Sequence, residues 1–218
     1  MKKTILLFSA LLAFGGLSAQ DKTSLVNPII GTNGMGHTFP GACVPFGLVQ
    51  LSPDTDTIPH NIDGKYQPRA YEYCAGYQHK DSSIVGFSHT HFSGTGHSDL
   101  GDILIMPTTG ALKLNPGTAT NPDGGYRSRF SHETEISRPG YYEVMLADYG
   151  VKAQLTTTKR VGVHKYTFPK EAKNQRIVLD MIHGIYNYDG KVLWTNIRVE
   201  NDTLVTGYRI TNGWARTN

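Results

Sequence analysis

Residues 151–156, VKAQLT, alternate between apolar and polar side chains. Successive side chains of a β-strand point to opposite faces, so Val151, Ala153 and Leu155 would share one face of this segment. A period of two residues is typical of a strand that has one buried face and one exposed face. The segment therefore predicts a β-sheet that packs on a hydrophobic core.

Other short apolar or alternating runs lie on both sides of this segment, separated by polar loops. The chain has 24 Gly and 11 Pro among 218 residues and no sustained 3.6-residue period, which argues against long helices. We therefore predict an all-β fold, an antiparallel β-sandwich. The predicted strands are residues 46–51, 84–87, 103–106, 142–146, 151–156, 163–168, 176–181, 191–200 and 203–210, with Asn201-Asp202 as a hairpin turn.

The end of the chain has no element that would cover the last predicted strand. The sequence stops four residues after Trp214. A strand at the edge of a sheet normally has a neighbour or some protection. We expect the sandwich to be incomplete at its C-terminal end and the sequence to be truncated, either as a fragment or as a shortened gene product.

The first residues have the composition of a secretory signal peptide. Two lysines precede an apolar run at residues 5–14, and small residues follow before the polar part begins. We predict a signal peptide at residues 1–20, cleaved near Ala19 or Gln20, and one domain at residues 21–218. The protein would be periplasmic or secreted.

Charge, hydropathy and cysteine content exclude some partners. The formal net charge is +3, and no basic cluster with interleaved aromatics is present, so we expect no nucleic acid partner. The N-terminal apolar run is too short for a membrane span, and no later segment reaches eighteen apolar residues. Cys43 and Cys74 would either pair in an oxidising compartment or remain two buried thiols, because a sequence does not give their separation.

Residues 86–102, GFSHTHFSGTGHSDLGD, form the densest polar cluster of the chain. They include three histidines, two aspartates, five serines or threonines and four glycines. Many donors and acceptors on a loop whose glycines allow close backbone approach suit the binding of a sugar or a metal ion. The histidines and hydroxyls could equally satisfy backbone groups of the loop itself.

Two catalytic or metal interpretations of this loop remain open. His89 and His91 would share one face of an extended chain, as zinc ligands do, with His97 or an aspartate completing the shell. A Ser-His-Asp system would combine Ser88 or Ser93 with one of these histidines and an aspartate of the loop. The G-x-S-x-G elbow that often presents such a serine is absent.

A second glycine-rich segment, residues 31–47, has no P-loop Lys-Ser/Thr pair and no βαβ setting, so it does not predict phosphate binding. Together with the first loop it completes an ordered series of motifs: VNPIIGT at 26–32, HTFPGA at 37–42, VPFG at 44–47, VQLSPD at 49–54, AGY at 75–77, and GFSHTH at 86–91 through Gly101-Asp102. This series resembles the N-terminal domain of glycoside hydrolase family 92, a family of exported exo-acting α-mannosidases. The resemblance covers residues 25–218.

The resemblance implies a supersandwich-like N-terminal domain beside a larger (α/α)6 catalytic domain. It also implies a calcium ion in the full-length enzyme and the removal of terminal α-mannose with inversion of configuration. Inversion needs one carboxylic acid and one carboxylate base, and in this family both lie in the C-terminal domain. We therefore expect no catalytic residue and no assigned metal ligand in this chain, and no activity from it alone.

The partners implied are a mannose-containing glycan and the missing catalytic domain. The alternative is a stand-alone carbohydrate-binding or interaction module without catalysis. In either case the loops at residues 34–41 and 88–102 are the candidates for a sugar-facing surface, because ligand pockets often lie at domain interfaces. The predicted substrate-binding residues are His37, Tyr77, Ser88, His89, His91, Ser93, Gly94, Thr95, Gly96, Asp99 and Asp102.

We also predict packing, stacking or capping roles for some aromatic and acidic residues outside these loops. Tyr77 would stack on a sugar, whereas Tyr71 and Tyr73 would pack as ordinary strand residues. Trp194 and Trp214 would pack in the core or at an interface. Asp54 and Asp56 follow Pro53, and we expect them to cap a solvated turn.

Overall fold

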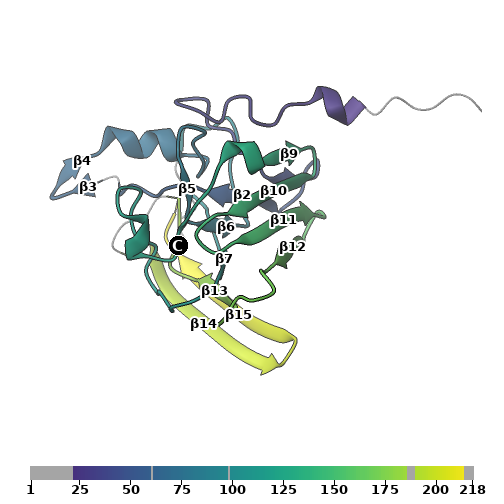
Figure 1. Cartoon of the computed structure of the whole chain (residues 1–218). Helices are drawn as coiled ribbons and strands as arrows, with labels where there is room; N and C mark the ends of the chain where they lie inside the picture. Colours follow the sequence, from purple (N-terminus) through teal and green to yellow (C-terminus); the bar gives the residue numbers. More distant parts are fainter. Residues whose placement is uncertain (1–21, 60, 98, 186–189, 214–218) are drawn as a thin grey trace, which may run out of the picture.

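Two antiparallel sheets build the body of the protein in the computed structural model, which describes residues 22–59, 61–97, 99–185 and 190–213 (Figure 1). The first sheet has the order β1 (Ala42–Cys43), β2 (Gln50–Asp54), β6 (Gly86–Ser88), β7 (Leu104–Thr108) and β13 (Arg176–Asp180). The second has the order β12 (Gly162–Thr167), β11 (Val151–Thr157), β10 (Tyr141–Leu146) and β9 (Ile136–Arg138).

The hydrophobic core lies between these sheets. Val151, Ala153 and Leu155 of β11 are buried, while the side chains that alternate with them are more exposed. They join one cluster with Leu51 and Phe87 of the opposite sheet. The prediction of an all-β sandwich is therefore confirmed, and the alternation at residues 151–156 identifies the face that packs inward.

Smaller elements surround the body. Two short pairs are β3 (Asn61–Ile62) with β4 (Lys65–Tyr66) and β5 (Ser83–Ile84) with β8 (Ser128–Arg129). The helical segments of the described residues are 3-10 helices: η1 (Lys22–Leu25), η2 (Pro68–Tyr73), η3 (Pro122–Gly124) and η4 (His132–Thr134). Within the described ranges, none is a long apolar helix of the kind that crosses a bilayer.

A long hairpin extends from the body, formed by β14 (Val192–Asn201) and β15 (Leu204–Thr211) (Figure 1). Its turn consists of Asp202 and Thr203, one residue later than the predicted pair Asn201-Asp202. Nearly all its side chains are exposed. Arg209 attaches the hairpin to the body, since its Nη1 donates to the carbonyl oxygens of Met181 and His183 at 3.2 and 2.6 Å.

The strand predicted at residues 46–51 is wrong in its position. The N–H of Gly47 donates to the carbonyl oxygen of Val44 at 2.9 Å and closes a turn. Phe46, inside this turn, has a φ of 57° and is fully exposed. The strand β2 therefore begins only at Gln50 and continues through Pro53 to Asp54.

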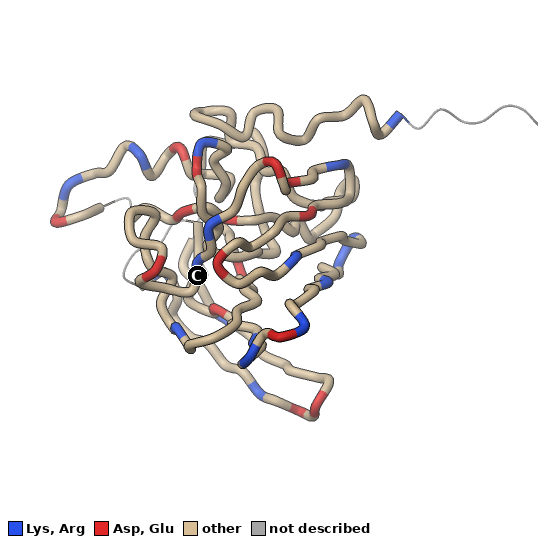
Figure 2. Tube along the Cα trace, in the orientation of Figure 1, with Lys and Arg blue, Asp and Glu red and all other residues tan. Residues whose placement is uncertain are grey.

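The structure also bears on the predictions about the cysteines and the tryptophans. Cys43 is exposed and Cys74 is buried, and the two do not form a disulfide. Trp194 is 59% exposed and so is not a core residue. Trp214 and the predicted signal peptide lie outside the described residues. Basic and acidic residues are interspersed along the trace (Figure 2).

Candidate functional site

The two glycine-rich loops lie together. One precedes β2 and the other follows β6, and these antiparallel neighbours bring both loops to the same end of the first sheet. The N–H of Gly94 donates to the carbonyl oxygen of His37 at 2.6 Å. The rings of Phe39 and His91 have centroids 5.3 Å apart. Segments that are more than fifty residues apart in the sequence thus form one surface.

A buried network of one carboxylate and two imidazoles lies beneath this surface. Asp54, at the end of β2, is fully buried. Its Oδ1 lies 2.8 Å from Nε2 of His91, and its Oδ2 lies 2.7 Å from Nε2 of His183. Both histidines are also buried. The network connects β2 with the segments that follow β6 and β13.

The hydrogen bonds of His91 define its role. Nδ1 lies 2.7 Å from the carbonyl oxygen of Gln50, and Nε2 contacts the Asp54 carboxylate. Both partners are acceptors, so each ring nitrogen of His91 faces an acceptor oxygen. Burial alone would raise the pKa of Asp54, but the charges and hydrogen bonds of the two histidines hold that pKa well below its usual range. Asp54 is therefore a buried carboxylate anion.

The expected solvated role of Asp54 is wrong. Pro53 lies inside a strand rather than a turn, so the carboxylate after it points into the body. Gly76 has a φ of 78°, and a Cβ there would lie 2.1 Å from Oδ1 of Asp54. This close approach explains the glycine of the AGY motif. Asp56 remains partly exposed, and its Oδ1 pairs with Nη2 of Arg127 at 3.1 Å.

A Ser-His-Asp nucleophile does not form at Ser88. Ser88 Oγ lies 3.1 Å from Nε2 of His91, the same nitrogen that contacts Asp54. In a catalytic triad the serine and the aspartate bind opposite nitrogens of the imidazole. Ser88 is also fully buried. These contacts exclude the arrangement that would activate the Ser88 hydroxyl.

His89 turns away from His91 and joins a different chain of hydrogen bonds. Its Nδ1 lies 2.7 Å from the carbonyl oxygen of Ile103, and its Nε2 lies 3.1 Å from Nε2 of His164. His164 Nδ1 lies 2.7 Å from the hydroxyl of Tyr166. Burial lowers the pKa of His89, and it lowers that of His164 to about 3. The pair His89 and His91 therefore does not form a zinc site in the described chain.

The two aspartates of the loop pair with basic residues next to or within the hairpin. Asp99 forms an ion pair with Lys191. Asp102 lies 3.0 Å from Nη2 of Arg209 and accepts from Thr90 Oγ1 at 2.8 Å. Calcium prefers six to eight oxygen ligands that are rich in carboxylate. Because both carboxylates are already neutralised by cations, the described loop does not offer a calcium site by itself.

The outer part of the loop is open to solvent. Ser93, Gly94 and Gly96 are exposed, and Thr95 is partly exposed. A Cβ on Gly96 would lie 1.8 Å from the hydroxyl oxygen of Tyr71, so the backbone at Gly96 lies against this ring. Small and hydroxyl-bearing residues thus form an accessible polar surface at residues 93–96, which we call the rim.

His37 adjoins this rim. Its ring makes an edge contact with Tyr71 at 4.9 Å between centroids. Its Nε2 is buried and has no hydrogen-bond partner among the residues that the structure describes. Buried polar atoms normally have a partner, so this nitrogen is a candidate contact for a ligand hydroxyl or a bridging water.

Tyr77 does not lie on the rim. It is 1% exposed and belongs to the core cluster, with its hydroxyl donating to Oε1 of Glu135 at 2.9 Å. Tyr71 and Tyr73 lie in η2 rather than in a strand, since Pro68 begins a 3-10 helix there. Of these three tyrosines, Tyr71 is the one next to the rim. Direct sugar contact by any of the predicted residues stays a prediction.

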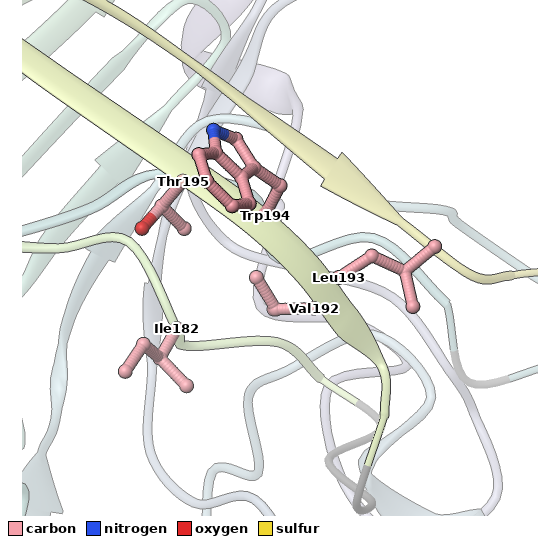
Figure 3. A pocket seen from close by; sticks show the side chains of 5 residues that line it. All are labelled: Ile182, Val192, Leu193, Trp194 and Thr195. Atoms are coloured by element: carbon pink, nitrogen blue, oxygen red, sulfur yellow. The ribbon is translucent and has the colours of Figure 1, made fainter.

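The hairpin carries a separate apolar hollow of about 310 Å³ (Figure 3). It is lined by Ile182 and by four consecutive residues of β14, from Val192 to Thr195. Trp194, half exposed, forms one wall. None of the predicted sugar-binding residues lines this hollow.

Four other histidines with defined contacts were not singled out from the sequence. His164 and His183 enter the networks above from β12 and from the segment after β13. His79 and His132 lie together with Glu135. Alternation in β12 and the spacing His132-x-x-Glu135 were the signals in the sequence. The contacts of His164 with His89, of His183 with Asp54 and of His79 with His132 join residues that are far apart in the sequence.

Comparison with known proteins shows to which family this chain belongs. The model of the glycosyl hydrolase family 92 N-terminal domain matches residues 25–218. The chain belongs to this family. A family 92 α-mannosidase of Bacteroides thetaiotaomicron, solved in complex with mannoimidazole, is 45% identical with a TM-score of 0.80, and the match covers 89% of this chain and 24% of that chain.

Two further relatives are more distant. An inverting mannosidase of the same bacterium is 25% identical with a TM-score of 0.62, over 90% of this chain and 23% of that chain. An uncharacterized secreted glycosidase of Arthroderma benhamiae is 29% identical over 158 residues, which are 68% of this chain and 18% of that protein. This chain therefore spans about a quarter or less of the length of these relatives.

Proposed function

We propose that this chain is the part of an exported α-mannosidase that supplies one wall of the sugar pocket. The observation that carries the proposal is the junction of the two glycine-rich loops, where exposed Ser93, Gly94 and Gly96 adjoin His37, whose buried Nε2 has no hydrogen-bond partner among the described residues. Sugar hydroxyls need many donors and acceptors at close range, and this rim offers them. The substrate would be a glycan with terminal α-mannose.

The chemistry of this enzyme would come from residues outside the chain. An inverting glycosidase needs two carboxyl groups on opposite sides of the scissile bond, about 6.5–9.5 Å apart, with room for a water. Asp54 is buried against two histidines, and both loop aspartates are paired with cations. None of these three is placed as a free acid or base. We assign the catalytic pair, and the ligands of the calcium ion, to a further domain.

Export is the second part of the proposal. A secreted relative and the composition of residues 1–20 both support a cleaved signal peptide and a periplasmic or extracellular location. Intact-mass measurement of the protein recovered from the cell exterior or periplasm should show loss of about the first twenty residues.

Hydrolysis of an aryl α-mannoside tests where the chemistry lies. The purified chain, with added calcium, should release no aryl alcohol above the buffer rate. Turnover that a chelator abolishes would show that the chain contains a complete site and would contradict the proposal. Sequencing the gene beyond the codon for Asn218 should find a reading frame that continues.

A stand-alone carbohydrate-binding module remains the alternative, since the polar rim is exposed in the isolated chain. Calorimetric titration with mannose and mannobiose addresses it. Binding together with a stop codon directly after Asn218 would favour the module, whereas an absence of heat or competition at millimolar ligand would rule it out.

A further inference from the structure

Glu135 is a carboxylate inside the body with an unusual set of partners. Its side chain is 3% exposed. Among the residues that the structure describes, its one ion-pair partner is His132, whose Nδ1 lies 2.7 Å from Oε2. A buried carboxylate normally needs a strong positive partner. The structure therefore places Glu135 where a cation would be stabilised.

The backbone holds His132 and Glu135 on the same side of a turn. The N–H of Glu135 donates to the carbonyl oxygen of His132 at 3.2 Å, at the end of η4. Side chains three residues apart eclipse in a 3-10 turn. Ser131 caps the turn, since its Oγ accepts from the N–H of Glu133 at 3.2 Å. The spacing His-x-x-Glu thus presents one imidazole and one carboxylate together.

His79 brings a second imidazole from a distant segment. The loop after η2 is anchored where the N–H of His79 donates to the carbonyl oxygen of Thr32 at 2.8 Å. The rings of His79 and His132 have centroids 4.0 Å apart and are tilted by 32°. The potential ligand atoms of His79, His132 and Glu135 all lie within 4.8 Å of one another.

We propose that His79, His132 and Glu135 form a binding site for a divalent transition-metal ion of the Zn²⁺ type. Two imidazoles and one carboxylate are the ligand types that zinc prefers in proteins, and three protein ligands leave a fourth position for water. Calcium takes oxygen ligands, so this histidine-rich site is distinct from a calcium site.

Two buried tyrosines would orient the carboxylate ligand. Tyr142 Oη donates to Oε1 of Glu135 at 2.7 Å, and Tyr77 Oη lies 2.9 Å from Oε1 and 3.0 Å from Oε2. A phenol hydroxyl donates to a carboxylate. Such partners fix the orientation of metal ligands. With the carboxylate held by two tyrosines, its Oε2 lies 2.7 Å from His132 Nδ1.

Metal binding requires only a small movement. Tetrahedral bonds of 2.0–2.1 Å place ligand atoms about 3.4 Å apart. The side chain of His132 is 37% exposed, so it is free to adjust, while Glu135 stays in place. The ion would bind to the lone pairs of His132 Nδ1 and Glu135 Oε2.

Zinc and cobalt binding by the full chain, freed of any affinity tag and of bound metal, tests the proposal. We expect one Zn²⁺ per chain after dialysis, measured by elemental analysis. Co²⁺ should give visible d–d bands that Zn²⁺ removes. His132→Ala and His79→Ala should each weaken zinc binding by at least about tenfold, and Tyr142→Phe should weaken it by about tenfold while keeping the ring in the core. His97→Ala, in the loop after β6, is the matched histidine control and should bind as the wild type does.

Failure to bind zinc or cobalt in a saturable manner would overturn the proposal. So would binding that both His79→Ala and His132→Ala leave unchanged, or that His97→Ala abolishes. Circular dichroism and the thermal midpoint of each variant without metal distinguish a lost ligand from a lost fold. Excess Ca²⁺ should not compete, and competition at equal concentration would count against a transition-metal site.

Discussion

The strands β11 and β14 contain similar proportions of apolar residues, yet they differ in burial. β11 buries alternate side chains against the first sheet, whereas β14 exposes nearly every residue along its length. Both belong to regular antiparallel pairs. Local sequence is enough to form a strand, but burial depends on a second layer. In the described part of the chain, the outer length of the hairpin lacks that layer.

The polar groups of the two regions differ in the same way. In the body, Asp54 is fully buried between His91 and His183. On the hairpin, Arg198 Nε lies 3.1 Å from Glu200 Oε2, with the arginine side chain 75% exposed. Solvent screens the exposed pair, while the buried one depends entirely on its partners. Stability should therefore be concentrated in the body.

Removing the buried charge should have the largest effect. Asp54→Asn leaves two histidines facing an uncharged amide, and we expect a loss of about 4 kcal/mol in the free energy of unfolding. The matched change on the hairpin, Arg198→Ala, should cost less than about 1 kcal/mol. Urea denaturation measures both. Equal losses would show that the two regions do not differ as described.

Replacing one leucine by alanine in each strand compares the body with the hairpin through a single residue type. Leu155→Ala in β11 removes a side chain that is 1% exposed, and it should cost about 3 kcal/mol. Leu193→Ala in β14 removes one that is 50% exposed, and it should change stability by no more than about 0.5 kcal/mol. A large loss for Leu193→Ala would mean that the hairpin is packed against another surface in solution.

Acid should weaken the body through His164. The pKa of this residue is about 3 in the folded chain, against about 6.5 in an unfolded one. Between these values the unfolded state binds the extra proton, so stability falls as the pH falls. The expected loss from pH 7 to 5 is about 2 kcal/mol.

His164→Gln provides the comparison for this pH dependence. Glutamine does not titrate, so the variant should lose about 2 kcal/mol less than the wild type over the same range. β14 and β15 contain no histidine. Asp54 contributes stability that is lost only below about pH 4, because its pKa is depressed. Identical pH profiles for the two proteins would count against a neutral, buried His164.

The strands were predictable from alternation because burial in a sandwich repeats every two residues. Of the candidate site, only the positions of the two glycine-rich loops could be predicted from the sequence. Asp54 contacts residues 37 and 129 positions away, and nothing beside Pro53 in the sequence indicates that. His79 and Glu135 likewise meet only in three dimensions. Contacts that the topology creates leave no local pattern, and the pairing of ligands was therefore missed.

The measurement that tests the sugar-facing surface most directly is a titration of the ¹⁵N-labelled chain with mannose, followed by NMR. At millimolar mannose, we expect saturable shift changes for the amides of residues 93–96 and for the imidazole of His37, with the shifts of residues 192–211 unchanged. Changes confined to the hairpin, or no change in either region, would contradict it.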